Sequence, residues 1–134
     1  MIIDFQANPH FVAFMAGYEE CALWSSIDDD GESLSAYDVA SNTADKFEAD
    51  CAAFYMANKA LIHDDAAPLS NCHASIGDRQ AAMAGHDFWL TRNGHGAGFW
   101  DGDWPDDIGE TLTRAAEAFG PVDLYVGDDG RVHQ

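Results

Sequence analysis

Apolar residues recur at helical spacing through the first half of the chain. Asn8 followed by Pro9 is typical of a helix start, because asparagine caps the first turn and proline fits within it. The apolar positions that follow predict a helix over residues 9–25. A second apolar stripe predicts a longer helix that Ser41 or Thr43 caps. The members of this stripe are Phe47, Cys51, Phe54, Tyr55 and Leu61.

The segment before residue 85 has weaker signals. Ser75 and Asp78 resemble a capping box, so we predict a short helix that ends near Ala84. Gly85 would then follow the helix, where glycine is favoured because it adopts the left-handed conformation without strain.

Residues 86–101 predict a β-hairpin. Asn93-Gly94 forms the centre of a tight turn in this prediction, since both residue types tolerate positive φ. With this register, Phe88 and Phe99 form a cross-strand pair that faces the core, and Trp89 lies on the other face.

The last third of the chain predicts one more helix and a terminal strand pair. Apolar residues from Ile108 to Phe119 lie on one helical face, after an Asp-Trp-Pro start and before a stop at Gly120. Residues 122–126 alternate as a strand does, and residues 131–133 return as an edge strand after an Asp-Asp-Gly turn.

This order of elements predicts an α+β fold. Three to four helices would pack on a small antiparallel sheet built from one or two hairpins. No repeat and no long linker divides residues 1–134, so we expect a single domain.

The charge of the chain is strongly negative. Asp and Glu number 24 against 6 Lys and Arg, which gives a net charge of −18, and most of the acidic residues are aspartate. Such a field repels nucleic acid and anionic membranes and attracts basic protein surfaces. Solubility, or adaptation to a salt-rich host, also accounts for an aspartate-rich and lysine-poor chain.

Short aspartate runs stand in the predicted loops and at helix starts. Part of this placement is local, because carboxylates are favoured at helix N-termini. The remainder is expected to contact a basic partner. The acidic candidates are Asp28, Asp29, Asp30, Asp64, Asp65, Asp103, Asp106, Asp107, Asp128 and Asp129.

Four tryptophans, Trp24, Trp89, Trp100 and Trp104, are candidates for an exposed aromatic patch. The last three lie in and just after the predicted hairpin and are the candidate contacts for a partner. Exposed, they would anchor a protein partner, because aromatic side chains dominate interface energetics. Packed beneath a helix, they would instead form a second small core.

Catalytic chemistry has little support in the sequence. The three cysteines are odd in number and form no CxxC pair, so we predict buried free thiols. A metal-dependent site would use hairpin residues, but no metal-binding spacing joins them. Its candidates are His86, Asp87, Arg92, His95 and Asp101. We therefore predict no catalytic residue, no metal and no cofactor.

Residues 85–101, GHDFWLTRNGHGAGFWD, resemble a signature of small accessory proteins of bacteriophages and mobile elements. Residues 122–130 resemble the tail of the same group, and the resemblance covers about residues 80–133. It implies a phage accessory gene product and brings no assigned activity. Small acidic phage proteins often mimic nucleic acid and block host defence enzymes, as anti-restriction and anti-CRISPR proteins do.

Charge and resemblance together predict an acidic accessory protein that binds a basic or nucleic-acid-binding protein. We expect no direct contact with nucleic acid or membrane. The alternatives are a small metal-dependent enzyme and a structural protein that forms homo-oligomers through the tryptophans. No apolar run is long enough for a membrane span and the start of the chain lacks signal-peptide features, so a cytoplasmic location is expected.

Overall fold

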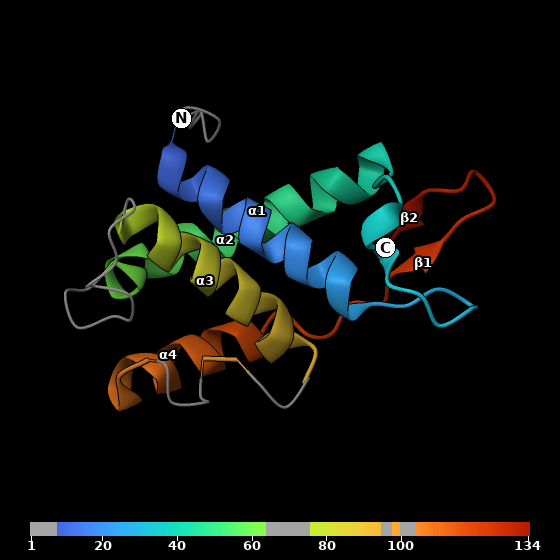
Figure 1. Ribbon diagram of the computed structural model, residues 1–134. Coiled ribbons are helices and arrows are strands. Elements are labelled where there is room, and N and C mark those ends of the chain that lie inside the picture. The colour runs from blue at the N-terminus through green and yellow to red at the C-terminus, as the bar shows by residue number, and fades with distance from the viewer. Residues whose placement is uncertain (1–7, 64–75, 95–97, 100–103) are drawn as a thin grey trace.

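The computed structural model describes residues 8–63, 76–94, 98–99 and 104–134, and for residues 76–78 it describes the backbone alone. These residues form four α-helices, one short 3₁₀ turn and a two-stranded antiparallel sheet (Figure 1). The elements are α1 (Pro9–Ser25), η2 (Leu34–Ala36), α2 (Ser41–Ile62), α3 (Ile76–Arg92), α4 (Asp106–Glu117), β1 (Tyr125–Val126) and β2 (Val132–His133). The coarse α+β prediction agrees with this mostly helical arrangement.

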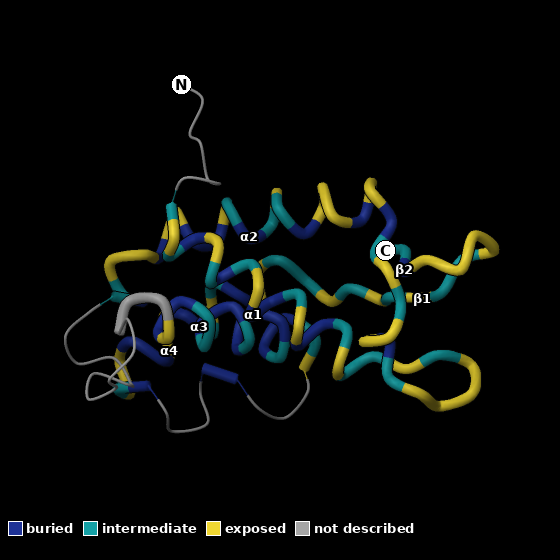
Figure 2. Tube along the Cα trace, turned by 45° about the horizontal axis from the view of Figure 1, so that its top comes forward, coloured by how far each residue is buried: buried dark blue, intermediate teal, exposed yellow. Residues whose placement is uncertain are grey.

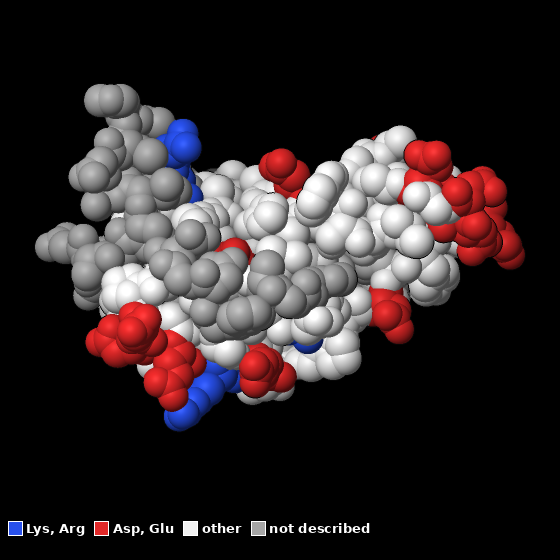
Figure 3. All heavy atoms as spheres, turned by 60° about the horizontal axis from the view of Figure 1, so that its bottom comes forward, with Lys and Arg blue, Asp and Glu red and all other residues white. Residues whose placement is uncertain are grey.

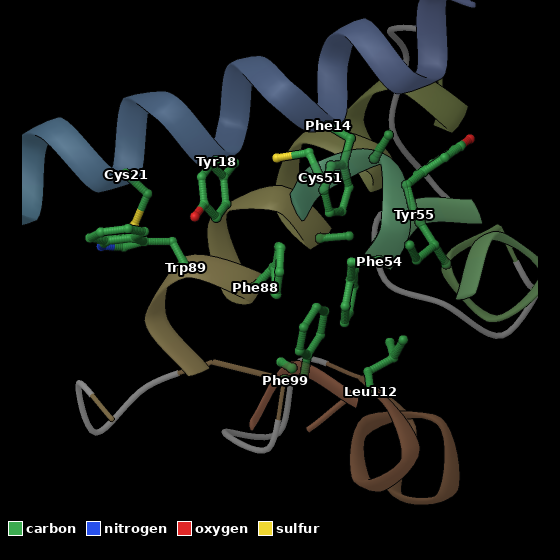
Figure 4. Close-up of a cluster of buried hydrophobic side chains, with 14 of the residues drawn as sticks. Phe14, Tyr18, Cys21, Cys51, Phe54, Tyr55, Phe88, Trp89, Phe99 and Leu112 are labelled. Carbon is green, nitrogen blue, oxygen red and sulfur yellow. The ribbon is translucent and has the colours of Figure 1, made fainter. Parts of the chain in front are cut away.

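The helices pack against one another and not against the sheet. Side chains from all four helices share one hydrophobic core, while the β1–β2 hairpin lies at one end of the bundle (Figures 1 and 2). The expectation that the helices cover a sheet was therefore wrong. An aromatic stack forms the centre of the core, with Phe54 of α2 lying 4.2 Å from Phe88 of α3 between ring centroids (Figure 4). Phe99 also stacks on Phe54, with 5.7 Å between the ring centroids.

The predicted first helix is confirmed, and so is its cap. The Asn8 side chain accepts hydrogen bonds from the backbone N–H groups of His10 and Phe11, at 3.0 and 3.2 Å. The predicted cap of α2 was wrong. Ala40 stands at the N-cap, and the buried Thr43 hydroxyl accepts instead from the N–H of Gln134.

The predicted hairpin at residues 86–101 was wrong, because residues 76–92 form one continuous helix. Asn93-Gly94 ends this helix. Gly94 has a φ of +65° and donates to the carbonyl of Thr91, while Asn93 donates to the carbonyl of Trp89. A left-handed glycine serves a helix C-terminus as well as a hairpin turn, so the pair was assigned to the wrong motif.

Gly85 lies inside α3, where a helix end was predicted. A Cβ atom at this position would lie 2.0 Å from the carbonyl oxygen of Phe14, and one at Gly17 of α1 would lie 2.1 Å from that of Ala82. Both values are far below van der Waals contact. The two glycines therefore let the backbones of α1 and α3 pass in direct contact.

The C-terminal hairpin is confirmed, although its strands are short. Tyr125 pairs with His133 and Val126 with Val132. Val132 is fully buried and also joins the segment before α2, because its N–H donates to the carbonyl of Asp38 and its C=O accepts from Ala40. The hairpin is thus fixed to the helical bundle through β2, and β1 is the outer strand.

The buried thiols are confirmed for Cys21 and Cys51, whereas Cys72 lies outside the described residues. Burial raises the pKa of the Cys21 thiol to about 12 and that of Cys51 well above its ordinary value. In a Cys72→Ser variant at neutral pH, we expect both thiols to react with Ellman's reagent roughly a thousandfold more slowly than in denatured protein. Reaction of the folded protein at the denatured rate would contradict this burial.

Candidate functional site

Acidic side chains gather at the end of the molecule that carries the hairpin (Figure 3). Residues 27–39 and 121–134 form this end, which we call the acidic end, and Arg131 is its only Lys or Arg. Its carboxylates are Asp28, Asp29, Asp30, Glu32, Asp38, Asp123, Asp128 and Asp129. All are at least partly accessible to solvent. This end therefore has a strong negative field, because Arg131 offsets only one of the eight charges.

Residues 28–32 form a compact loop, which we call the acidic loop. Asp28 organises it: Oδ1 accepts from the N–H groups of Asp30 and Glu32, both at 2.9 Å, and Oδ2 accepts from the Tyr37 hydroxyl at 2.9 Å. These hydrogen bonds lower the pKa of Asp28 below its ordinary value. The carboxylates of Asp29 and Asp30 are exposed and receive none of the hydrogen bonds of the loop.

We expect Asp28→Ala to loosen the acidic loop and Asp29→Ala, its matched control, to leave the loop intact. The amide hydrogens of Asp30 and Glu32 should exchange faster with solvent only in the first variant. Because the folded pKa of Asp28 is lowered, its stabilisation is complete above the ordinary value and is lost as pH falls through the lowered one. Equal exchange rates in the two variants would contradict the organising role of Asp28.

Asp128 and Asp129 lie in the hairpin turn and are exposed. The turn closes through a hydrogen bond from Gly130, at a φ of +73°, to the carbonyl of Gly127. The His133 ring lies 3.0 Å from an Asp129 oxygen, and this hydrogen bond lowers the pKa of Asp129. Asp129 is therefore held in place. The Asp128 side chain makes no hydrogen bond to a described residue and remains available to a partner.

Large apolar side chains are exposed next to these carboxylates. Trp24 and Ile27 are each 64% exposed and Tyr125 is 57% exposed. Ile27 and Tyr125 line a groove of about 340 Å³ together with residues 28–30 of the acidic loop. The sequence-based interpretation named Trp24 in its candidate aromatic patch. It missed Ile27, which adjoins an apolar helix, and Tyr125, which was assigned to a strand without regard to its outward face.

Asp106 and Asp107 are exposed but lie apart from the acidic end, in the first turn of α4. Carboxylates in this position are stabilised by the partial positive charge of the helix N-terminus. They therefore have a structural explanation that the exposed carboxylates of Asp29, Asp30 and Asp128 lack.

Two of the three candidate tryptophans belong to the core. Trp89 is 1% exposed and donates from Nε1 to the Ser25 hydroxyl at 2.8 Å. Trp104 is 3% exposed and donates to Asp87 Oδ2 at 2.8 Å. Neither ring is presented to a partner, so the structure corrects their assignment as contact residues. Asp64, Asp65, Trp100 and Asp103 lie outside the described residues.

The residues of the metal-site hypothesis are not arranged on a hairpin. His86 and Asp87 lie on α3, and Arg92 is buried at its end, bound to Asp50 and Tyr18. His95 and Asp101 lie outside the described residues. Within the part of the chain that the structure describes, no three histidine, cysteine or carboxylate side chains are grouped to hold a metal ion.

No protein-family model, no curated protein and no solved structure matches this chain. None of the described helices combines the length and the apolar character needed to cross a membrane.

Proposed function

We propose that this protein is a small acidic binding protein that occupies a basic surface of another protein, as a nucleic-acid mimic does. The main support is the acidic end, where eight carboxylates face one arginine and stand beside exposed Trp24, Ile27 and Tyr125. Individual exposed ion pairs contribute only about 0–1 kcal/mol each, but many together steer association. The apolar side chains add burial that carboxylates alone do not supply.

The resemblance of residues 85–101 to phage accessory proteins motivates the choice of partner. A bacterial host protein that binds nucleic acid, such as a restriction or CRISPR enzyme, has the basic groove that this charge complements. Inhibition of such a defence system is the function that we propose.

Competition with DNA tests the proposal. The protein is immobilised and exposed to a bacterial lysate at low ionic strength, and the captured proteins are then eluted with duplex DNA or with salt. We expect nucleic-acid-binding proteins to be captured and released by both eluents, because DNA and the acidic end occupy the same surface. Capture of proteins without affinity for nucleic acid, or retention in the presence of DNA, would contradict mimicry.

A charge-matched pair of variants locates the surface. Asp29→Asn with Asp30→Asn removes two charges from the acidic loop, and Asp106→Asn with Asp107→Asn removes two from α4. Only the first double variant should weaken capture, because the α4 carboxylates lie outside the acidic end. Equal weakening by both would indicate a response to net charge alone.

A further inference from the structure

The outer edge of β1 is open for pairing. Val132 of β2 uses both backbone groups toward residues 38–40, away from β1. In an antiparallel pair of strands, two directly opposite residues bond to each other through both their N–H and C=O groups, or both point these groups away from each other. The N–H and C=O of Val126, the partner of Val132, therefore point away from β2, and no described residue binds them.

This open edge faces the acidic loop. Figures 1 and 2 both show β1 between β2 and the loop that follows α1. The groove of about 340 Å³ between them is lined by Leu124, Tyr125 and Val126 on one side and by residues 27–30 and Tyr37 on the other. Backbone hydrogen-bonding groups, exposed apolar side chains and carboxylates thus converge on one groove.

We infer that this groove binds an extended, lysine- or arginine-rich segment of the partner, which adds as a strand to the edge of β1. Strand addition takes main-chain hydrogen bonds from the open edge and specificity from neighbouring side chains. Here Val126 supplies the donor and acceptor, Ile27 and Tyr125 supply apolar contact, and Asp29 and Asp30 select basic side chains. The inference rests on the proposed function and specifies how the partner is held.

Charge argues for a basic segment over a second copy of this chain. Pairing of β1 with β1 would bring two acidic loops together, in molecules that each have a net charge of −18. Charged residues beside an open strand edge are a common way to prevent such self-pairing. A basic segment would instead be attracted by the same carboxylates.

A pair of synthetic peptides tests the inference on the whole chain. The first is a short peptide of alternating lysine and valine. The second has the same side chains with every backbone nitrogen methylated, so its backbone cannot donate hydrogen bonds. We expect the first to bind at low ionic strength and the second to bind roughly tenfold more weakly. The affinity of the first should decrease as salt increases.

Val126→Pro tests the protein side of the same bond. Proline removes an N–H that β2 does not use, so the hairpin should persist, as circular dichroism would show. We expect roughly tenfold weaker binding of the first peptide and no further effect of methylation. If this variant unfolds, the comparison of the two peptides on the unaltered chain still tests strand addition.

Three results would overturn strand addition. They are equal affinity for both peptides, unchanged binding by Val126→Pro, and a dimer of this chain that Val126→Pro dissociates. Suppose that one of these results is found and that Asp29→Asn with Asp30→Asn still weakens the binding of both peptides equally. The acidic surface of the proposed function then stands, and only strand addition fails. If neither peptide responds to salt or to that variant, both fail.

Discussion

Gly85→Ala should destabilise the protein by about 2–4 kcal/mol, although alanine ordinarily stabilises a helix interior by about 1 kcal/mol over glycine. The added Cβ would lie 2.0 Å from the Phe14 carbonyl oxygen, a backbone atom that no side-chain rotation can move. Helices α1 and α3 must therefore separate, which opens the aromatic core that they enclose. Chemical denaturation measures the loss directly.

The sign of this effect distinguishes close helix packing from helix propensity. Gly17→Ala, on the facing helix, should destabilise by a similar amount, since its Cβ would lie 2.1 Å from the Ala82 carbonyl oxygen. Ala16→Ser adds one atom at an exposed position next to Gly17 and should change stability by less than about 0.5 kcal/mol. A stabilised Gly85→Ala variant would show that α1 and α3 do not approach so closely.

Arg92→Met should destabilise the protein by about 3–5 kcal/mol, because it leaves several buried polar groups without a partner. The Arg92 side chain is 3% exposed. It donates to Asp50 at 2.8 Å and to the Tyr18 hydroxyl at 3.1 Å. It also donates to the carbonyls of Gly120 and Phe119, which joins the end of α4 to the other three helices.

Two further variants separate the charge of Arg92 from its geometry. Arg92→Lys keeps the charge but not the fork of donors, so we expect it to lose a large part of the same stability. Asp50→Asn, whose side chain is 32% exposed, should cost only about 1–2 kcal/mol, because the other three acceptors remain. Thermal or denaturant unfolding of the three variants gives the ranking. A fully stable Arg92→Met protein would contradict a buried network.

The helices whose apolar spacing is long and regular could be predicted from the sequence. Residues 9–25 have apolar residues at helical spacing after a start signal, and they form α1. The segment from Ile108 to Phe119 has one apolar face and a stop signal, and α4 covers most of it. The segment around Phe88 was mistaken for a strand because aromatic residues and Asn93-Gly94 suit a hairpin locally. The helix is favoured by the tertiary contacts of Gly85 and the core aromatics, which local preference does not contain.

The candidate site was predicted only in part. The aspartate runs identified Asp28, Asp29, Asp30, Asp128 and Asp129, and the fold brings these loop and hairpin residues to one end of the molecule. Sequence separation hid this proximity, since about a hundred residues lie between the two segments. Trp89 was misassigned because burial of an aromatic residue depends on which helix covers it.

Mapping a bound basic peptide by two-dimensional amide spectra tests the central claim, that the acidic end is the binding surface. Isotope-labelled protein is titrated with the lysine–valine peptide at low ionic strength. We predict that the largest changes in amide chemical shift fall on residues 27–32 and 124–129, and that the amide chemical shifts of Asp106 and Asp107 do not change. Changes centred on α4, or spread evenly over every exposed carboxylate, would contradict the account.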